Sequence, residues 1–306
     1  MKLIKLLSLI LALLVGAVHA SSYLYVSGNS PRGETTLIEL NPSTGELIGS
    51  PLFVGEDSFF HGASDFAINN GYFYATNAGG VAKCVLMPDK SIRNCVYTGN
   101  GFSYPAAIKF NAVSSNHTLY AYIANKPYKK VKSSVSKCAV NTTNGELVNC
   151  ALTGALFDTP ISIAFYNDSY AYITNAEGEK SIIRCKASSS GELVNCEVMK
   201  NTGITQPRSI AISDNHAYIA DGEQNSISLC IINSKAGVFE NCKPTGSGFV
   251  YPTATLIYHE RLYVTNLNDD TLSSCQIQNG DGLLSDCVKS SYYFNSPYRM
   301  VVYETP

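Results

Sequence analysis

The sequence predicts an all-β fold: a six-bladed β-propeller with four antiparallel strands in each blade. Three observations carry this prediction. A tyrosine-centred quartet recurs six times, each copy is rich in β-branched, aromatic and turn-forming residues without helical periodicity, and five copies contain a pair of cysteines at nearly constant spacing. A repeat with strand-type composition favours blades of a propeller over the paired helices of other repeat folds.

The quartet reads Tyr, then Val, Ile or Ala, then Thr, Ala or Ser, then Asn, Asp or Gly. Its copies begin at Tyr25, Tyr74, Tyr122, Tyr172, Tyr218 and Tyr263. Successive tyrosines are 49, 48, 50, 46 and 45 residues apart, a period typical of propellers and solenoids. We therefore expect one blade per copy, with the quartet in its second strand.

Prolines, cysteines and turn residues locate the other three strands of each copy. The first strand begins at a proline after a Phe-x-x lead-in, as in Phe157-Asp158-Thr159-Pro160, and continues as an apolar run such as 161–165. Proline is tolerated at the first position of a strand. The third and fourth strands carry one cysteine each, and Asn144-Gly145 between them is a hairpin signal.

The phase of the repeats predicts how the ring closes. The first predicted strand, at 23–26, is a second strand of a blade, and the last, at 297–302, is a first strand. The C-terminal strand should therefore join the three N-terminal strands in one blade, which removes the exposed edges of a linear array.

The quartets and the Pro-x-x-Ile lead-ins resemble the YVTN-repeat β-propeller family and, more loosely, the lactonase-like and NHL propellers. The resemblance covers nearly all of 21–306 and implies the propeller architecture. It does not imply one activity, because such propellers include enzymes, binding proteins and members without an assigned role. The paired cysteines are an addition to the common family pattern.

The cysteines predict five disulfides, each joining the third and fourth strands of one blade. The pairs are Cys84/Cys95, Cys138/Cys150, Cys185/Cys196, Cys230/Cys242 and Cys275/Cys287. Facing residues on antiparallel strands lie within disulfide reach. The spacing lacks a C-x-x-C motif, so redox catalysis or zinc binding is not expected. The first blade has Ile38 and Ser50 at the matching positions.

Residues 1–20 have the pattern of a cleaved signal peptide. Lys2 and Lys5 precede an apolar stretch at 6–18, and Val18-His19-Ala20 resembles a signal-peptidase site. We expect residues 21–306 to form a single domain, secreted or periplasmic, without a membrane span and monomeric. The net charge of −2 gives no footprint for nucleic acid.

Two loop faces follow from the strand order. We call the face with the loops before the first strand and after the second strand the top face, and the other the bottom face. Three glycosylation sequons, at Asn116, Asn141 and Asn167, map to the bottom face. They would leave the top face free for a partner, although turns are rich in Asn and Ser in any case.

Candidate binding residues lie on the top face. They comprise His61 in a loop, four residues near the starts of first strands and five that end the second strands: Tyr104, Arg208, Tyr251, Arg299, Asn77, Asn125, Asn175, Asp221 and Asn266. The ring of amide and carboxylate oxygens could bind a divalent cation or a polar ligand. The favoured interpretation of this ring is structural, because Asn and Asp end strands by bonding the turn backbone.

An ion pair is also expected near the axis. In each predicted first strand we count the proline position as the first residue. The third residues are then Asp65, Ala107, Ser162, Ser209, Ala254 and Arg299. Four are small, as crowding near the axis requires. The predicted closure puts Asp65 and Arg299 in neighbouring blades, so we expect them to pair and lock the closing blade. The alternative is that Arg299, with Arg208 and Tyr104, holds an anionic ligand.

Two functions remain open at this stage. The leading interpretation is a non-catalytic binding protein that presents its top-face loops to a protein or glycan partner. The alternative is a lactonase- or lyase-like enzyme with a divalent metal on the axis. Lactonase-like enzymes hold that metal with Glu, Asn and Asp, and the starts of the predicted first strands here contain no Glu. The sequence contains no G-x-S-x-G, H-E-x-x-H or P-loop motif, and no cofactor or specific metal ligand is predicted.

Overall fold

The computed structural model describes residues 21–28, 35–55, 58–60, 62–113, 118–128 and 131–305. The predicted signal peptide, His61 and the sequon residue Asn116 lie outside the described residues. Within them no helix has the length and apolarity that a membrane crossing requires. The expectations for the signal peptide and for His61 therefore stay predictions.

The strands form six four-stranded antiparallel sheets. Blade 1 contains β24 (Pro297–Glu304), β1 (Ser22–Gly28), β2 (Thr35–Leu40) and β3 (Leu47–Gly55), and blade 2 contains β4 (Asp65–Asn69), β5 (Tyr72–Asn77), β6 (Gly80–Leu86) and β7 (Ile92–Thr98). Blade 3 contains β8 (Pro105–Val113), β9 (Thr118–Asn125), β10 (Ser134–Val140) and β11 (Leu147–Thr153), and blade 4 contains β12 (Pro160–Tyr166), β13 (Tyr170–Asn175), β14 (Ser181–Ala187) and β15 (Leu193–Val198). Blade 5 contains β16 (Pro207–Ser213), β17 (His216–Asp221), β18 (Ser226–Ile232) and β19 (Phe239–Thr245), and blade 6 contains β20 (Pro252–Tyr258), β21 (Arg261–Asn266), β22 (Thr271–Ile277) and β23 (Leu284–Lys289).

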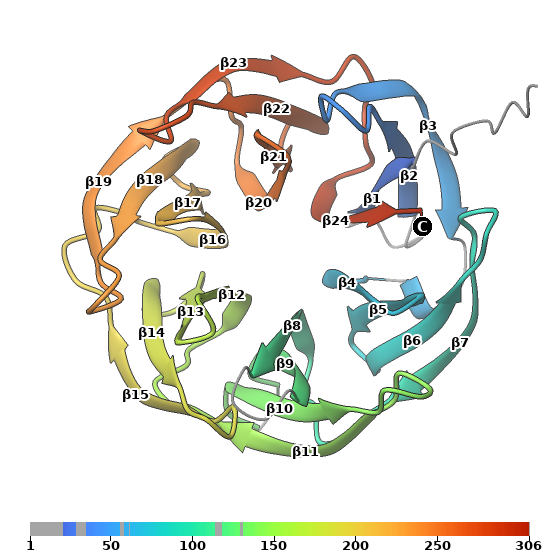
Figure 1. Cartoon of the computed structure of the whole chain (residues 1–306), viewed down its shortest axis with the longest axis vertical. Helices are drawn as coiled ribbons and strands as arrows, with labels where there is room; N and C mark the ends of the chain where they lie inside the picture. The colour runs from blue at the N-terminus through green and yellow to red at the C-terminus, as the bar shows by residue number, and fades with distance from the viewer. Residues whose placement is uncertain are drawn as a thin grey trace, which may run out of the picture.

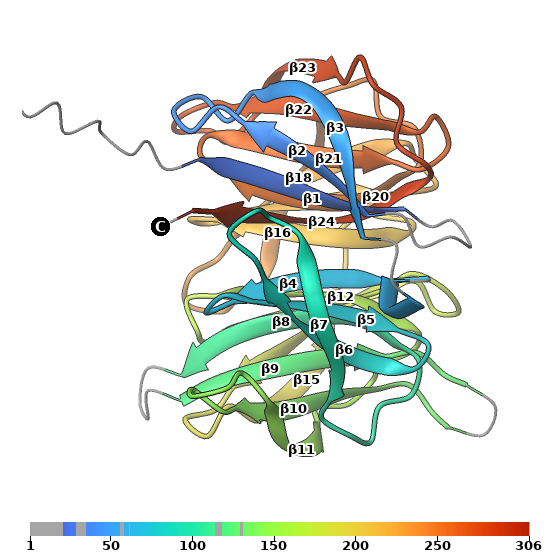
Figure 2. The same ribbon diagram turned by 90° about the vertical axis from the view of Figure 1, so that its right-hand side faces the viewer.

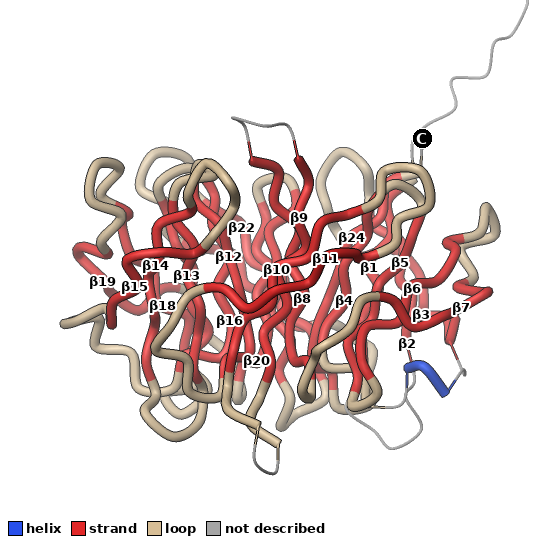
Figure 3. Tube along the Cα trace, turned by 90° about the horizontal axis from the view of Figure 1, so that it is seen from below, coloured by secondary structure: helices blue, strands red, loops and turns tan. Residues whose placement is uncertain are grey.

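The six blades surround a central axis, which confirms the predicted fold class. The innermost strands are β24, β4, β8, β12, β16 and β20, and the fourth strand of each blade lies at the rim (Figure 1). A short 3-10 helix, η1 (Ser58–Phe60), lies in the loop that leads from blade 1 into blade 2. Viewed from the side, the loops gather on two faces, with η1 on the lower one (Figure 3). That lower face is the top face defined above.

The closure of the ring is also confirmed. Strand β24 pairs antiparallel with β1, from Ser22 opposite Glu304 to Ser27 opposite Arg299. The backbone N–H of Thr305 donates to the carbonyl of Ser21 at 2.9 Å. Figure 2 shows β24 and β1 side by side, although they come from opposite ends of the chain.

The repeated tyrosines join consecutive blades. All six are fully buried, and burial raises their pKa values. Each hydroxyl donates to a backbone carbonyl in the third-to-fourth-strand turn of the next blade: Lys90, Gly145, Gly191, Gly237, Gly282 and, across the closure, Gly45. The approach is close, because a Cβ on Gly145 would lie 2.7 Å from the Tyr74 hydroxyl oxygen. The recurring tyrosine therefore links neighbouring blades through its hydroxyl, in addition to packing its ring in the core.

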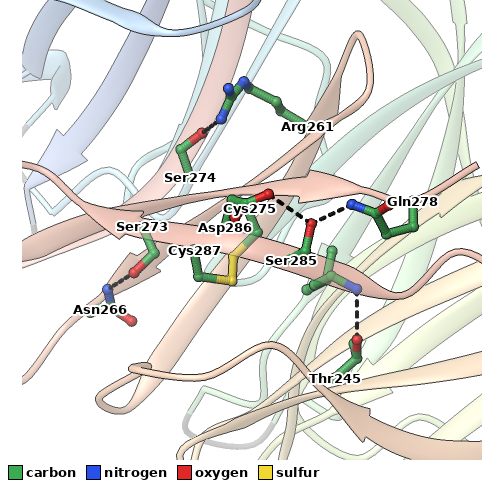
Figure 4. Close-up of a disulfide and its surroundings, with 11 residues drawn as sticks. Thr245, Arg261, Asn266, Ser273, Ser274, Cys275, Gln278, Ser285, Asp286 and Cys287 are labelled. Carbon is green, nitrogen blue, oxygen red and sulfur yellow. Dashed lines mark hydrogen bonds between the residues drawn. A yellow bond between two sulfur atoms is a disulfide. The ribbon is translucent and has the colours of Figure 1, made fainter.

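All ten cysteines are paired as predicted, and none of them is free. The Cα atoms of each pair are 4.0 Å apart. Figure 4 shows one bridge, between β22 and β23. Five disulfides indicate an oxidising, non-cytoplasmic compartment. The bridges are Cys84–Cys95, Cys138–Cys150, Cys185–Cys196, Cys230–Cys242 and Cys275–Cys287.

The two cysteines of a bridge are not partners in the strand ladder, which corrects the expectation that directly facing residues form it. In blade 3 the register passes from Lys137 opposite Ala151 to Ala139 opposite Val148, so the bridge lies at a β-bulge. The other four bridges lie at the same register shift. The residue before the second cysteine is left-handed, as at Asn149 with φ 52°, because the bulge adds one residue to the fourth strand.

The two halves of each bridge also differ in burial. The first cysteine, on the third strand, is fully buried in every pair. The second, on the outermost strand, is partly exposed and packs against the edge of the core, because no further strand covers it. These partly exposed cysteines are Cys95, Cys150, Cys196, Cys242 and Cys287.

Two of the sequon residues lie in described turns. Asn141 follows β10, and its side-chain oxygen accepts a hydrogen bond from the backbone N–H of Thr143 at 2.9 Å. Asn167 is exposed in the turn between β12 and β13. Both turns lie on the bottom face, since they connect third to fourth and first to second strands. Glycosylation at these positions stays a prediction.

Candidate functional site

The innermost strands enclose a cavity of about 260 Å³ on the propeller axis. Its wall includes five of the six third-position residues expected near the axis: Asp65, Ser162, Ser209, Ala254 and Arg299. Between them lie aliphatic side chains such as Ile163 and Ile210, and the hydroxyl of Thr255. Small and hydroxyl-bearing residues thus leave room around two charged side chains.

Arg299 is held by backbone carbonyls around the axis. Its guanidinium donates to the carbonyls of Ile161 at 2.9 Å and Arg208 at 3.4 Å. It also donates to Tyr298 at 3.1 Å and to Thr253. Each of these residues follows the proline that opens its strand, in β12, β16, β24 and β20. One buried cation, only 4% exposed, therefore binds equivalent positions of four blades.

The expected ion pair between Asp65 and Arg299 is not a direct contact. Among the described residues, the salt bridges within 4.0 Å do not include these two. The carbonyls of β12, β16 and β20 draw the guanidinium across the axis, whereas an Asp65 oxygen accepts a hydrogen bond from the N–H of Ile108 at 2.9 Å. The two charges still attract one another at longer range. The pairing prediction was therefore wrong in its contact and right in placing both charges at the same cavity.

Lys109 is a second cation in the cavity wall, and the sequence analysis missed it. It is the fifth residue of β8, where the innermost strands of the other blades have Ala67, Ala164, Ala211, Leu256 and Val301. That departure from apolar residues was the available signal. The Lys109 side chain is exposed to the lumen of the ring, where the surrounding blades keep bulk water away from it. This desolvation lowers the pKa of the ammonium group, and the negative charge of Asp65 opposes the change.

Asp65 is the one carboxyl among the described residues that line the cavity. Burial raises its pKa from 3.8 to about 6, against the lowering effects of Arg299, the N–H groups of Ile108 and Phe66, and Lys109. A carboxyl with a pKa near 6 is largely ionised at neutral pH and still basic enough to accept a proton. Asp65 thus has the properties of a general base.

The five residues that end the second strands are buried and bonded to their own loops. The side-chain oxygen of Asn266 accepts a hydrogen bond from the N–H of Val250 at 3.2 Å. Its amide nitrogen donates to the Ser273 hydroxyl at 2.9 Å (Figure 4). The Asp221 carboxylate accepts from Thr205 and Gln206. The others bond in the same way: Asn77, Asn125 and Asn175. These contacts support the structural interpretation of this ring.

A divalent cation on the axis does not fit these residues. Within the part of the chain that the structure describes, no three His, Cys, Asp or Glu side chains come together as metal ligands. The cavity wall offers one carboxyl, Asp65, with the cations Lys109 and Arg299 beside it. Those charges repel a further cation, so no step of the function proposed below uses a metal.

Two of the remaining top-face candidates, Arg208 and Tyr251, lie beside Tyr298, whose ring centroid is 4.5 Å from the guanidinium of Arg299. Arg208 donates to the hydroxyls of Tyr251 and Tyr298, both at 3.3 Å, and its guanidinium lies against both rings. Tyr104 stacks on Tyr128 with ring centroids 5.7 Å apart. The structure therefore brings Arg208 and Tyr251 together with Tyr298, which the sequence analysis did not single out.

Comparisons with known proteins show the fold. No family model and no curated protein sequence matches the chain, so membership of the YVTN-repeat family stays a prediction. A chain of a nidogen/laminin complex superposes with a TM-score of 0.66 and 11% identity, covering 92% of this chain and 98% of its own. The periplasmic gluconolactonase PpgL of Pseudomonas aeruginosa gives 0.64 and 14%, covering 92% and 99%. A putative 6-phosphogluconolactonase from Bacteroides fragilis gives 0.62 and 12%, covering 94% and 99%. The chain therefore shares the β-propeller architecture of lactonase-like proteins.

Proposed function

We propose that the axial cavity is the catalytic site of a hydrolase that opens small lactones. The observation that carries this proposal is Asp65, a carboxyl with a pKa of about 6 that faces the cavity with Lys109 and Arg299. A general base tuned toward neutral pH and a nearby cation are the two groups that hydrolysis of a cyclic ester needs. The cavity of about 260 Å³ is slightly smaller than the ~300–1,000 Å³ of typical small-molecule sites, which suits a small substrate.

The proposed reaction uses these groups in sequence. Ionised Asp65 takes a proton from a water molecule as the water oxygen attacks the lactone carbonyl carbon. The ammonium of Lys109 stabilises the oxyanion that forms, and Arg299 adds positive potential from its fixed place on the axis. The ring C–O bond then breaks, and the leaving alkoxide takes the proton back from Asp65. The product is a hydroxy acid, and Asp65 returns to its ionised state.

The structural relatives support this chemistry over a partner-binding role. Two of the similar structures are described as a gluconolactonase and a putative 6-phosphogluconolactonase, and their identities of 12–14% make lactone hydrolysis a proposal for this chain. The expected protein or glycan partner has no comparable support in the catalytic cavity. It depends on the loops of the top face.

The test is hydrolysis of glucono-1,5-lactone, followed as acid release in a pH-stat with the spontaneous rate subtracted. We expect the rate to rise with pH through about 6, because Asp65 acts in its ionised form. Asp65→Asn should lower the rate by about 100-fold or more, the usual contribution of a general base. Lys109→Met should lower kcat with little change in KM.

Asp286→Asn is the matched control. Asp286 lies on the outermost strand β23 at the left-handed position where the equivalent residues are Asn94, Asn149, Asn195 and Asn241. The substitution removes a carboxylate of the same type without touching the cavity, so the rate should not change. Hydrolysis that is absent across small lactones, or that survives Asp65→Asn at full rate, would refute the proposal.

A further inference from the structure

The mouth of the channel on the top face holds a group of aromatic and cationic side chains outside the catalytic cavity. We call it the mouth cluster, and it comprises Tyr104, Lys126, Tyr128, Arg208, Tyr251 and Tyr298. Tyr104 and Tyr251 come directly before the prolines that open β8 and β20, and Lys126 directly follows β9. These positions belong to top-face loops of blades on different sides of the axis.

Positive charge converges here without a carboxylate partner. Burial alone would raise the pKa of Tyr298, but the charges of Arg299, Lys126 and Arg208 together hold it below its usual value. Among the described residues, no Asp or Glu oxygen lies within 4.0 Å of these three cations, since the salt bridges present involve other basic residues. The mouth cluster thus has a net positive potential at its floor.

Two buried polar atoms at the floor have no hydrogen-bond partner among the described protein groups. They are the Nε of Arg208 and the side-chain oxygen of Gln206. Arg208 is 8% exposed and Gln206 is similarly enclosed. Unpaired buried polar atoms are costly, and a ligand carrying both acceptors and hydroxyl donors would satisfy one of each kind.

The rim provides flat aromatic surface. Tyr104 and Tyr128 stack with an interplanar angle of 19°, and they are 42% and 50% exposed. Ala106, Ile161 and Ala176, near the starts of β8 and β12 and the end of β13, form a small buried apolar cluster. An aromatic rim beside buried cations suits a ligand that has C–H faces as well as negative charge.

We propose that the mouth cluster binds an acidic sugar, a hexuronic acid residue, with its carboxylate on Arg208 and Lys126 and its ring against Tyr104 and Tyr128. Arginine binds carboxylates through directed N–H groups, and aromatic rings offer apolar area with polar edges for hydroxyl groups. A neutral sugar would leave the cations unpaired. Arg299 separates the mouth cluster from the catalytic cavity, so this site does not depend on the proposed hydrolysis.

The test is calorimetric titration of the mature protein at low salt with sodium D-glucuronate, D-glucose and an oligogalacturonide. We expect glucuronate or the oligogalacturonide to bind at least about tenfold more tightly than glucose, because a charge-assisted hydrogen bond is worth about 1.5–3 kcal/mol and about 1.4 kcal/mol corresponds to tenfold. Binding of the oligogalacturonide alone would identify a polysaccharide as the source of the acidic sugar. Binding should weaken as salt is added.

Variants separate this site from the rest of the molecule. Tyr104→Ala, a change at a half-exposed side chain, should weaken glucuronate binding by about tenfold, and Arg208→Gln should weaken it further. Tyr293→Ala removes another exposed tyrosine, near Phe53 at the outer strand of blade 1, and should change nothing. Asp65→Asn should lower the rate of lactone hydrolysis by about 100-fold or more and leave glucuronate binding intact.

Three outcomes would overturn the proposal. They are equal affinity for glucose and the acidic sugars, no binding of either acidic sugar, and full affinity in a folded Tyr104→Ala protein. Each outcome is independent of lactone hydrolysis, so the failure of this site can be distinguished from the failure of the catalytic proposal.

Discussion

Replacing Asp65 with asparagine should stabilise the protein at neutral pH but not in acid. The pKa of Asp65 rises from its ordinary 3.8 to about 6 in the folded protein because burial disfavours the carboxylate. One pKa unit corresponds to about 1.4 kcal/mol, so keeping Asp65 ionised costs about 3 kcal/mol of folding free energy. Asparagine has the same shape, can still accept from the N–H of Ile108, and carries no charge.

The pH window follows from the two pKa values. Between pH 4 and 6 the folded protein binds more protons at Asp65 than the unfolded chain does, so this residue's contribution to stability falls as pH rises through that window. Above about pH 7 the cost is constant. Asp65→Asn should therefore exceed the parent by about 3 kcal/mol at pH 7.5 and match it near pH 4.

Urea denaturation with the disulfides intact, repeated from pH 4 to pH 8, measures this difference. Asp286→Asn on β23 is the control and should stay within about 0.5 kcal/mol of the parent at every pH. If the Asp65→Asn advantage is the same at pH 4 and pH 7.5, or if the variant is less stable at pH 7.5, then Asp65 does not carry the burial cost argued here.

Three further predictions concern the ring. Tyr122→Phe removes the 2.7 Å hydrogen bond to the carbonyl of Gly191 and should lower the unfolding free energy by about 1–2 kcal/mol. Tyr293→Phe is the control and should leave the unfolding free energy unchanged. Equal losses in the two variants would contradict the interblade role of Tyr122. Arg299→Met leaves four carbonyls without their cation and should cost about 3–5 kcal/mol in the same assay, whereas a loss below about 1 kcal/mol would mean that water replaces the guanidinium. Deleting 297–306 removes β24 and should abolish cooperative thermal unfolding, and an unchanged melting temperature would contradict closure through that strand.

The fold was predictable because it depends on local, repeated signals. Six quartets at a regular spacing fix the number of blades, and the phase of the first and last strands fixes the closure. The disulfide pairing followed once each cysteine had been assigned to a strand, although the bulge at each bridge and its left-handed residue were missed. The sequence does mark the left-handed residue, because Asn or Asp precedes the second cysteine in five blades. In the first blade Gly49 precedes Ser50 at the same position.

The site was predictable only in part, because side-chain choice near the axis depends on distances across the ring. The alignment of first strands correctly placed Asp65 and Arg299 at the axis. It could not show that carbonyls of three other blades come within reach of the guanidinium, since that depends on the radius of the closed ring. Lys109 was visible as a departure from apolar residues, and strand alternation puts it on the same face as Ala107. Whether its side chain reaches the cavity of Asp65 and Arg299 depends again on the closed ring.

The positions of the disulfides determine which part of the molecule they protect. Each bridge spans 11 or 12 residues and stays inside one blade, so no disulfide crosses a boundary between blades. The contacts between blades that the structure describes are non-covalent: the tyrosine hydroxyls, Arg299, interblade ion pairs and hydrophobic packing. The β24–β1 ladder, which closes the ring, is likewise held by hydrogen bonds. In a fully oxidised chain, β24 can therefore separate from β1 and open the ring while all five disulfides stay intact. At high concentration and temperature, β24 of one chain could then close the ring of another, which would give strand-exchanged oligomers in which every native disulfide is intact.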